Sequence, residues 1–287
     1  MKKMVAIVIC VAMLLTLTSC NYGEKRKQET ADMFESFEKN DNVILLTCFE
    51  LVIGEEHYDL DEIKYNDQEC HIVYLEEDGF YSYTYNQNNL SVEFLYTQYD
   101  GFKTISLGTE TLPSEIRNDL FFDNCFCFGM HDPNTDEAKL MYYCWLVDTK
   151  EVKILDKDSV TLQSLNSKDN NRSDRYSFSY TSTFLQDYID ITDNETGLSK
   201  RIDKSILNTF DEGKQIKKAI KSTRFNVNRV FVDEETIYFA TIAGVNFLGD
   251  PCYYYIYKWN FETEKCEFYT SVYFEHWQEY LTDMYIK

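Results

Sequence analysis

The 287-residue sequence has few basic residues, with 28 Lys and Arg against 49 Asp and Glu, so its formal net charge is −21. Phosphate binding depends on clustered Lys and Arg, so this balance argues against nucleic acid as a partner. Glycine (10) and proline (3) are too scarce for a collagen-like or low-complexity chain. By contrast, 23 Tyr and 20 Phe are too many for a disordered acidic segment. These proportions predict an acidic globular protein.

The N-terminus combines a short basic start with an apolar run. Lys2 and Lys3 precede the stretch Met4–Leu17, which carries no charged residue. Spanning a bilayer takes about 20 apolar residues, so this stretch is too short for a permanent transmembrane helix. A basic start followed by a short apolar run is the layout of a secretory signal.

The apolar run ends in Leu17-Thr18-Ser19-Cys20. This tetrapeptide resembles the lipobox of bacterial lipoproteins, in which the cysteine becomes the lipidated N-terminus. The resemblance implies removal of residues 1–19, a diacylglycerol on Cys20, and a palmitate-bearing anchor on the extracytoplasmic face of the cell membrane. Two or more acyl chains hold a protein stably on a bilayer. The alternative is an ordinary signal peptide that is cleaved near a cysteine.

The residues after Cys20 divide into a tether and a body. We expect residues 20–40 to form a lipid-anchored tether ending in a short helix, with Phe34 and Phe37 on one side. Residues 41–287 are expected to form a single domain. Alternation of aromatic with small polar residues, as in Phe80–Tyr85 and Tyr176–Thr181, is typical of strands. The body is therefore predicted to be all-β.

Turn signals recur at a nearly constant spacing along the body. Hairpin turns at Gly54, Asp100, Asp148, Asp193 and Asn260 are separated by 46, 48, 45 and 67 residues. A second turn, such as the one at Asp123-Asn124, precedes most of these hairpins. Two hairpins in about 47 residues match the four-stranded blade of a β-propeller.

The body thus resembles a five-bladed β-propeller. The C-terminal run Ser271–Ile286 is expected to supply two strands, and Val43–Ile63 a hairpin, so that both termini share one blade. Closing the ring in this way removes exposed sheet edges. The alternatives are a β-sandwich pair or another β-rich lipoprotein fold.

The longest step between turns contains Lys204–Ser222, a segment with helical periodicity. Without these 19 residues the step is 48, so we expect a helical insertion at the periphery of the β core. The segment and its flank hold the main basic cluster of the chain: Lys214, Lys217, Lys218, Lys221 and Arg224. These side chains are predicted either to contact an anionic partner or to form a solvated helix face.

Seven cysteines remain after Cys10 and Cys20. If the segments around Leu120–Gly129 and Lys139–Val147 pair across a symmetric loop, Cys125 lies opposite Cys144, where a disulfide can form. The alternative is that both are buried free thiols. The sequence has no Cys-x-x-Cys and its four His are scattered, so we predict no metal site and no cofactor.

Two functional classes fit these features. His131-Asp132-Pro133-Asn134 superficially resembles the Asp-Pro-Asn word of invertase-like glycoside hydrolases. However, it lies in the second repeat, the Arg-Asp-Pro partner is replaced by Gly249-Asp250-Pro251, and Glu-Cys is reversed as Cys266-Glu267. Asp-Pro-Asn is also a favourable turn. We therefore predict a membrane-anchored, non-catalytic module that binds an unknown protein or glycan. The alternative is a secreted glycoside hydrolase that uses carboxylates in a central funnel.

Overall fold

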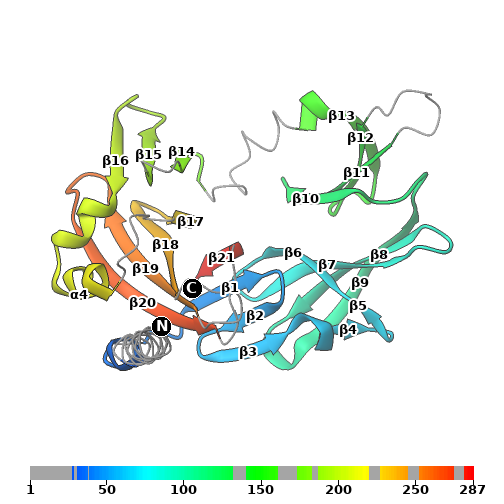
Figure 1. Cartoon of the computed structure of the whole chain (residues 1–287). Helices are drawn as coiled ribbons and strands as arrows, with labels where there is room; N and C mark the ends of the chain where they lie inside the picture. The colour runs from blue at the N-terminus through cyan, green and yellow to red at the C-terminus, as the bar shows by residue number, and fades with distance from the viewer. Residues whose placement is uncertain are drawn as a thin grey trace, which may run out of the picture.

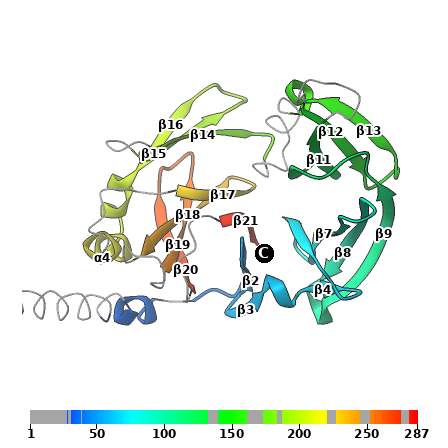
Figure 2. The same ribbon diagram turned by 45° about the vertical axis from the view of Figure 1, so that its right-hand side comes forward.

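The computed structural model describes residues 28, 31–37, 39–131, 140–160, 173–182, 187–219, 227–244, 252–274 and 281–287. Within these ranges, five antiparallel sheets are arranged in a ring (Figures 1 and 2). The predicted five-bladed, all-β propeller is confirmed, and the fold is not the β-sandwich that we considered as an alternative. None of the helices described is long and apolar enough to cross a membrane.

We number the sheets as blades in ring order and give their strands in order of pairing. Blade 1 contains β21 (Leu281–Ile286), β1 (Val43–Thr47), β2 (Glu50–Ile53) and β3 (Glu56–Asp59). Blade 2 contains β6 (His71–Leu75), β7 (Gly79–Asn86), β8 (Ser91–Gln98) and β9 (Lys103–Thr111). Blade 3 contains β10 (Asn118–Phe122), β11 (Cys125–His131), β12 (Leu140–Leu146) and β13 (Val152–Asp156).

Blade 4 has three strands among the described residues, namely β14 (Tyr176–Ser182), β15 (Asp187–Asp193) and β16 (Ser199–Asp203). A fourth strand is expected before β14, and residues 161–172, which precede it, are outside the described part of the chain. Blade 5 contains β17 (Val227–Asp233), β18 (Thr236–Gly244), β19 (Cys252–Asn260) and β20 (Cys266–Phe274). A separate two-stranded ribbon, β4 (Lys64–Tyr65) and β5 (Gln68–Glu69), connects blades 1 and 2.

The hairpin turns lie where the sequence spacing places them. Each of the five predicted positions falls at the turn between the last two strands of a blade, as Asp148 does between β12 and β13. The turn between β10 and β11 is Asp123-Asn124, and both residues have positive φ, 49° and 54°. A two-residue turn of this kind needs positive φ at both positions, which Asp and Asn tolerate.

Both termini share blade 1, as predicted, but they contribute unequally. The C-terminus supplies only β21, which pairs with β1 in the register Val43↔Ile286 and Leu45↔Met284. The expected second C-terminal strand instead belongs to blade 5, because β20 pairs with β19 along nearly its whole length. The N-terminal run therefore supplies three strands rather than a single hairpin.

Asp283 on β21 connects neighbouring blades at the inner strands. The residue is 6% exposed, and its carboxylate accepts a hydrogen bond from the Leu75 backbone N–H of β6 at 2.9 Å. The guanidinium of Arg229 on β17 lies 3.9 Å from the same carboxylate. A buried carboxylate needs such partners to offset its lost hydration, so Asp283 fixes β21 between blades 5 and 2.

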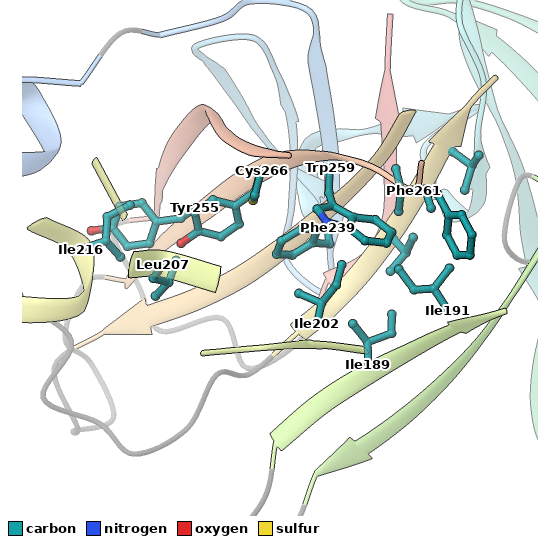
Figure 3. Close-up of a cluster of buried hydrophobic side chains, with 14 of the residues drawn as sticks. Ile189, Ile191, Ile202, Leu207, Ile216, Phe239, Tyr255, Trp259, Phe261 and Cys266 are labelled. Carbon is teal, nitrogen blue, oxygen red and sulfur yellow. The ribbon is translucent and has the colours of Figure 1, made fainter. Parts of the chain in front are cut away.

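The largest buried cluster joins blades 4 and 5 to the segment that was expected to be peripheral (Figure 3). That segment begins with the 3-10 helix η3 (Lys204–Asn208) and continues as α4 (Asp211–Ala219). Leu207 is 1% exposed and Ile216 is fully buried, and both pack in the cluster with Ile202 and Tyr255. The segment is helical, as predicted, but the expectation that it lies outside the core is wrong.

The short helix before the propeller is also part of this core. Residues 31–35 are helical, and Phe34 on this helix and Phe37 just after it are 6% and 7% exposed. Phe34 packs on Tyr253 and Phe37 packs on Phe268, with ring centroids 4.7 and 4.8 Å apart. Phe34 and Phe37 thus pack on the propeller upstream of residue 41, where the single domain was expected to begin.

Candidate functional site

A pocket of about 250 Å³ lies where the chain entering the propeller passes over blades 1 and 5. Its wall comes from the helix at 31–35 and Lys39-Asn40 after it, from the turn between β2 and β3 with the start of β3, and from the second half of β20. The residues that line it are Phe34, Glu35, Lys39, Asn40, Gly54, Glu55, His57, Thr270, Ser271, Val272 and Tyr273. We call this cavity the entry pocket.

Lys39 is fixed in the entry pocket by contacts on both sides. Its Nζ donates hydrogen bonds to the Phe34 carbonyl at 3.1 Å and to Ser271 Oγ at 3.2 Å. The same ammonium lies 3.0 Å from the centre of the Phe34 ring, a cation–π contact. One residue further on, the Asn40 N–H donates to Thr270 Oγ1 at 3.0 Å. Lys39 and Asn40 are thus held against β20.

Burial lowers the pKa of the Lys39 ammonium to about 8, although the carboxylates of Glu35 and Glu55 oppose this shift. Lys39 therefore remains mostly protonated at neutral pH and lies among two acidic groups. The formal charges of these three side chains sum to −1, so the pocket repels an anionic ligand. A neutral ligand is not subject to this repulsion.

The entry pocket is lined by both polar groups and aromatic side chains. The His57 ring lies edge-on to Phe274 at 5.7 Å, and its Nδ1 is 2.9 Å from Glu50 Oε2. Tyr273 is 37% exposed, and its ring centre is 6.1 Å from that of Phe34. A few fixed polar groups beside aromatic surfaces are typical of small-molecule and sugar sites. The arrangement can bind a compact, hydroxyl-rich ligand.

The predicted basic cluster is only partly within the described residues. Lys214 pairs with Asp211 at 2.7 Å, and Lys217 donates to Asn208 Oδ1 at 2.8 Å. Lys218 lies on α4, but its side chain is outside the described part of the structure, as are Lys221 and Arg224 entirely. Lys214 and Lys217 thus contact residues of their own segment in the described structure, which is typical of a solvent-exposed helix face.

The predicted pairing of strands β11 and β12 is correct, but its register is two residues away from the expected one. Cys144 lies opposite Cys127, and Cys125 lies opposite Leu146. The expected loop is symmetric about the point between residues 134 and 135. In the structure His131 pairs with Leu140, so the midpoint of the connection lies between residues 135 and 136, and each residue of β11 faces a residue two positions further along β12. Cys125 and Cys144 are both buried free thiols in the structure, not a disulfide.

The carboxylates considered for glycoside hydrolysis are not brought together in the described residues. Asp132-Pro133-Asn134 and Asp250 lie outside them, and Cys20 does so too. Glu267 projects from β20, the last strand of blade 5, and pairs with Lys258 and Lys265. Its hydrogen bonds to these two ammonium groups lower its pKa to about 2. Glu267 therefore stays ionised at neutral pH and is unsuited to donate a proton.

Sequence reasoning missed both the entry pocket and a group of three cysteines in blade 3. The sulfur atoms of Cys125, Cys127 and Cys144 all lie within 4.8 Å of one another. The available signal was the Cys-x-Cys spacing, which puts two sulfurs on one face of a strand. The entry pocket has no such local signal, because its walls come from segments more than 200 residues apart in sequence.

Comparison with known proteins yields no sequence relationship: no family model matches the chain, and no curated protein does. Among solved structures, TolB from Acinetobacter baumannii has a TM-score of 0.30 and 10% identity, covering 80% of this chain. This chain spans about half, 54%, of that TolB chain. The WD40 domain of SCAP from fission yeast has a TM-score of 0.26 and 8% identity, covering 79% of this chain and 71% of its own. The propeller assignment rests on the strand order and registers described above.

Proposed function

We propose that this protein is a membrane-anchored, extracytoplasmic lipoprotein whose propeller binds a ligand without transforming it. The observation that carries the anchor is the filled lipobox Leu17–Cys20 directly after an apolar run. The proposed ligand site is the entry pocket, because its groups are fixed in place and match a neutral, hydroxyl-rich molecule. A glycan is the ligand class that this chemistry favours.

The length of the tether supports a role close to the membrane. Thirteen residues, 21–33, separate Cys20 from Phe34, which packs on blade 5. A chain of that length spans at most about 50 Å when fully extended. The entry pocket adjoins the helix that contains Phe34, so an anchor at Cys20 keeps the pocket within a short distance of the lipid surface. A ligand carried at that surface, such as an envelope glycan, can reach it.

We expect Cys20→Ala to abolish lipid attachment. The full gene would be expressed in a bacterium supplied with radiolabelled palmitate, and the labelled protein would be compared by gel and by membrane fractionation. Cys48→Ala is the matched control, because Cys48 is an exposed cysteine of the folded body and should keep the label. Equal labelling of the Cys20→Ala and wild-type proteins would contradict the proposed anchor.

Glycan binding at the entry pocket is expected to depend on Tyr273. Purified protein would be screened against neutral oligosaccharides, with calorimetry on the binders and chromatography to detect released products. Tyr273→Ala should weaken binding by about 10-fold or more, because truncating an aromatic side chain at the centre of a binding site costs about 2 kcal/mol or more. Phe49→Ala removes another exposed ring, 60% accessible, and should leave binding unchanged.

Two results would overturn this assignment. If Tyr273→Ala binds glycans as well as wild type does, the entry pocket is not the site. If oligosaccharides are cleaved by the wild-type protein, the protein is an enzyme of the hydrolase class that the sequence left open.

A further inference from the structure

Blade 3 contains a group of three thiols that the proposed function does not use. Cys125 and Cys127 project from the same face of β11, and Cys144 of β12 lies directly opposite Cys127. The three sulfur atoms lie within 4.8 Å of one another, and those of Cys125 and Cys127 are 3.6 Å apart. We call these residues the thiol triad.

The thiol triad is enclosed by apolar side chains. Cys125, Cys127 and Cys144 are 6%, 0% and 1% exposed. Their cluster includes Phe122, Tyr142 and Val160, with partly buried leucines around it. Among the described residues, no His, Asp or Glu joins the three sulfurs as a possible fourth ligand. The site therefore offers three soft donors in a mostly apolar enclosure.

One cationic side chain adjoins the triad, because Lys153 lies opposite Cys144 on β13. Metal ions bind cysteine as the thiolate, so a bound cation takes the place of the thiol protons.

We propose that Cys125, Cys127 and Cys144 form a buried three-sulfur site for Cu(I). Thiolate sulfur is a soft ligand that selects Cu(I), zinc or iron–sulfur clusters. With metal–sulfur bonds of about 2.3 Å, three sulfurs in a plane around one ion lie about 4 Å apart, which agrees with the observed spacing. Structural zinc almost always takes four ligands, and the described surroundings supply three.

Binding at this site involves no electron transfer. Copper enters and remains as Cu(I), three sulfur–copper bonds form, and the thiol protons leave to the solvent. The competing chemistry is a disulfide between Cys127 and Cys144, which face each other across the two strands. Such a bond would use two of the three donors, so the two states exclude each other.

The test is a Cu(I) titration of the full-length protein in detergent, under anaerobic reducing conditions, in competition with the chromophoric chelator bathocuproine disulfonate. We expect one Cu(I) per wild-type chain. Cys127→Ser should lower the affinity at least about 100-fold, because the loss of a direct ligand exceeds the 10–100-fold effect of losing an outer-shell partner. X-ray absorption should show about three sulfurs at about 2.3 Å.

Cys266→Ser is the matched control, because Cys266 is 4% exposed but lies in the core of blades 4 and 5. It should bind Cu(I) like wild type. Circular dichroism without copper establishes that each variant is folded, and Cys144→Ala replaces Cys127→Ser if the latter is not. The proposal is overturned if wild type binds no Cu(I), if a folded triad variant binds it equally, or if Zn(II) binds more tightly than Cu(I). Mass spectrometry that finds a Cys127–Cys144 disulfide in the native protein overturns it too.

Discussion

Deleting residues 281–287 is expected to abolish the cooperative thermal unfolding of the protein. The deletion removes β21, the strand that places the C-terminus beside β1 in blade 1. Leu281, Met284 and Ile286 are 4%, 0% and 6% exposed in the core shared by blades 1 and 5. Burial of each such side chain contributes about 1.5–3 kcal/mol, so their joint loss approaches the 5–15 kcal/mol by which domains are typically stable.

The same deletion removes Asp283 and leaves the edge of β1 without its partner strand. An unpaired inner edge exposes backbone N–H and C=O groups and favours aggregation. We therefore expect the truncated chain to show no sharp melting transition by circular dichroism and to elute as aggregate on gel filtration. Thr282→Ala, an exposed position on the same strand, should melt within about 2 °C of wild type. A truncated protein that unfolds cooperatively near the wild-type temperature would contradict the role of β21.

The blades could be predicted from sequence because their signals are local. Turn residues such as Asp100 and Asp148 and the alternation of strands like Phe80–Tyr85 act over a few positions, and their spacing then gives the repeat. Which strands each terminus contributes to blade 1 could not be predicted from local signals. Both β20 and β21 contain apolar residues suited to pairing, and only tertiary contacts decide that β20 pairs with β19 and β21 with β1.

The candidate sites were harder to predict for the same reason. The thiol triad depends on a register that differs by two residues from the expected one, and nothing local fixes it across the long connection between His131 and Leu140. The entry pocket depends on where the helix at 31–35 packs, which is decided by Phe34 and Phe37 against blade 5. The spacing of Phe34 and Phe37 predicted that they lie on one side of a short helix, but it could not identify the surface against which they pack.

The segment η3–α4 was correctly predicted to be helical, but it was wrongly predicted to contribute little to the stability of the core. Its helical period and its basic residues are visible in the sequence, and they indicated a peripheral insertion. In the structure its charged groups pair locally, while Leu207 and Ile216 fill the core between blades 4 and 5 (Figure 3). Charge on one face of a helix does not report how deeply the other face is buried.

Leu207→Ala and Ile216→Ala are therefore each expected to lower the free energy of unfolding by about 2–5 kcal/mol, because each leaves a cavity in a closed core. Chemical denaturation of the purified protein measures this loss. Lys214→Ala, on the exposed face of α4, should change the stability by at most about 1 kcal/mol, since its ion pair with Asp211 is at the surface.

Replacing Lys204–Ala219 with a Gly/Ser linker removes both Leu207 and Ile216 at once. Loop closure itself costs little for a linker of similar length, so the lost stability measures packing. If the linker variant keeps the wild-type melting temperature, this segment is an appendage and the core of blades 4 and 5 is complete without it.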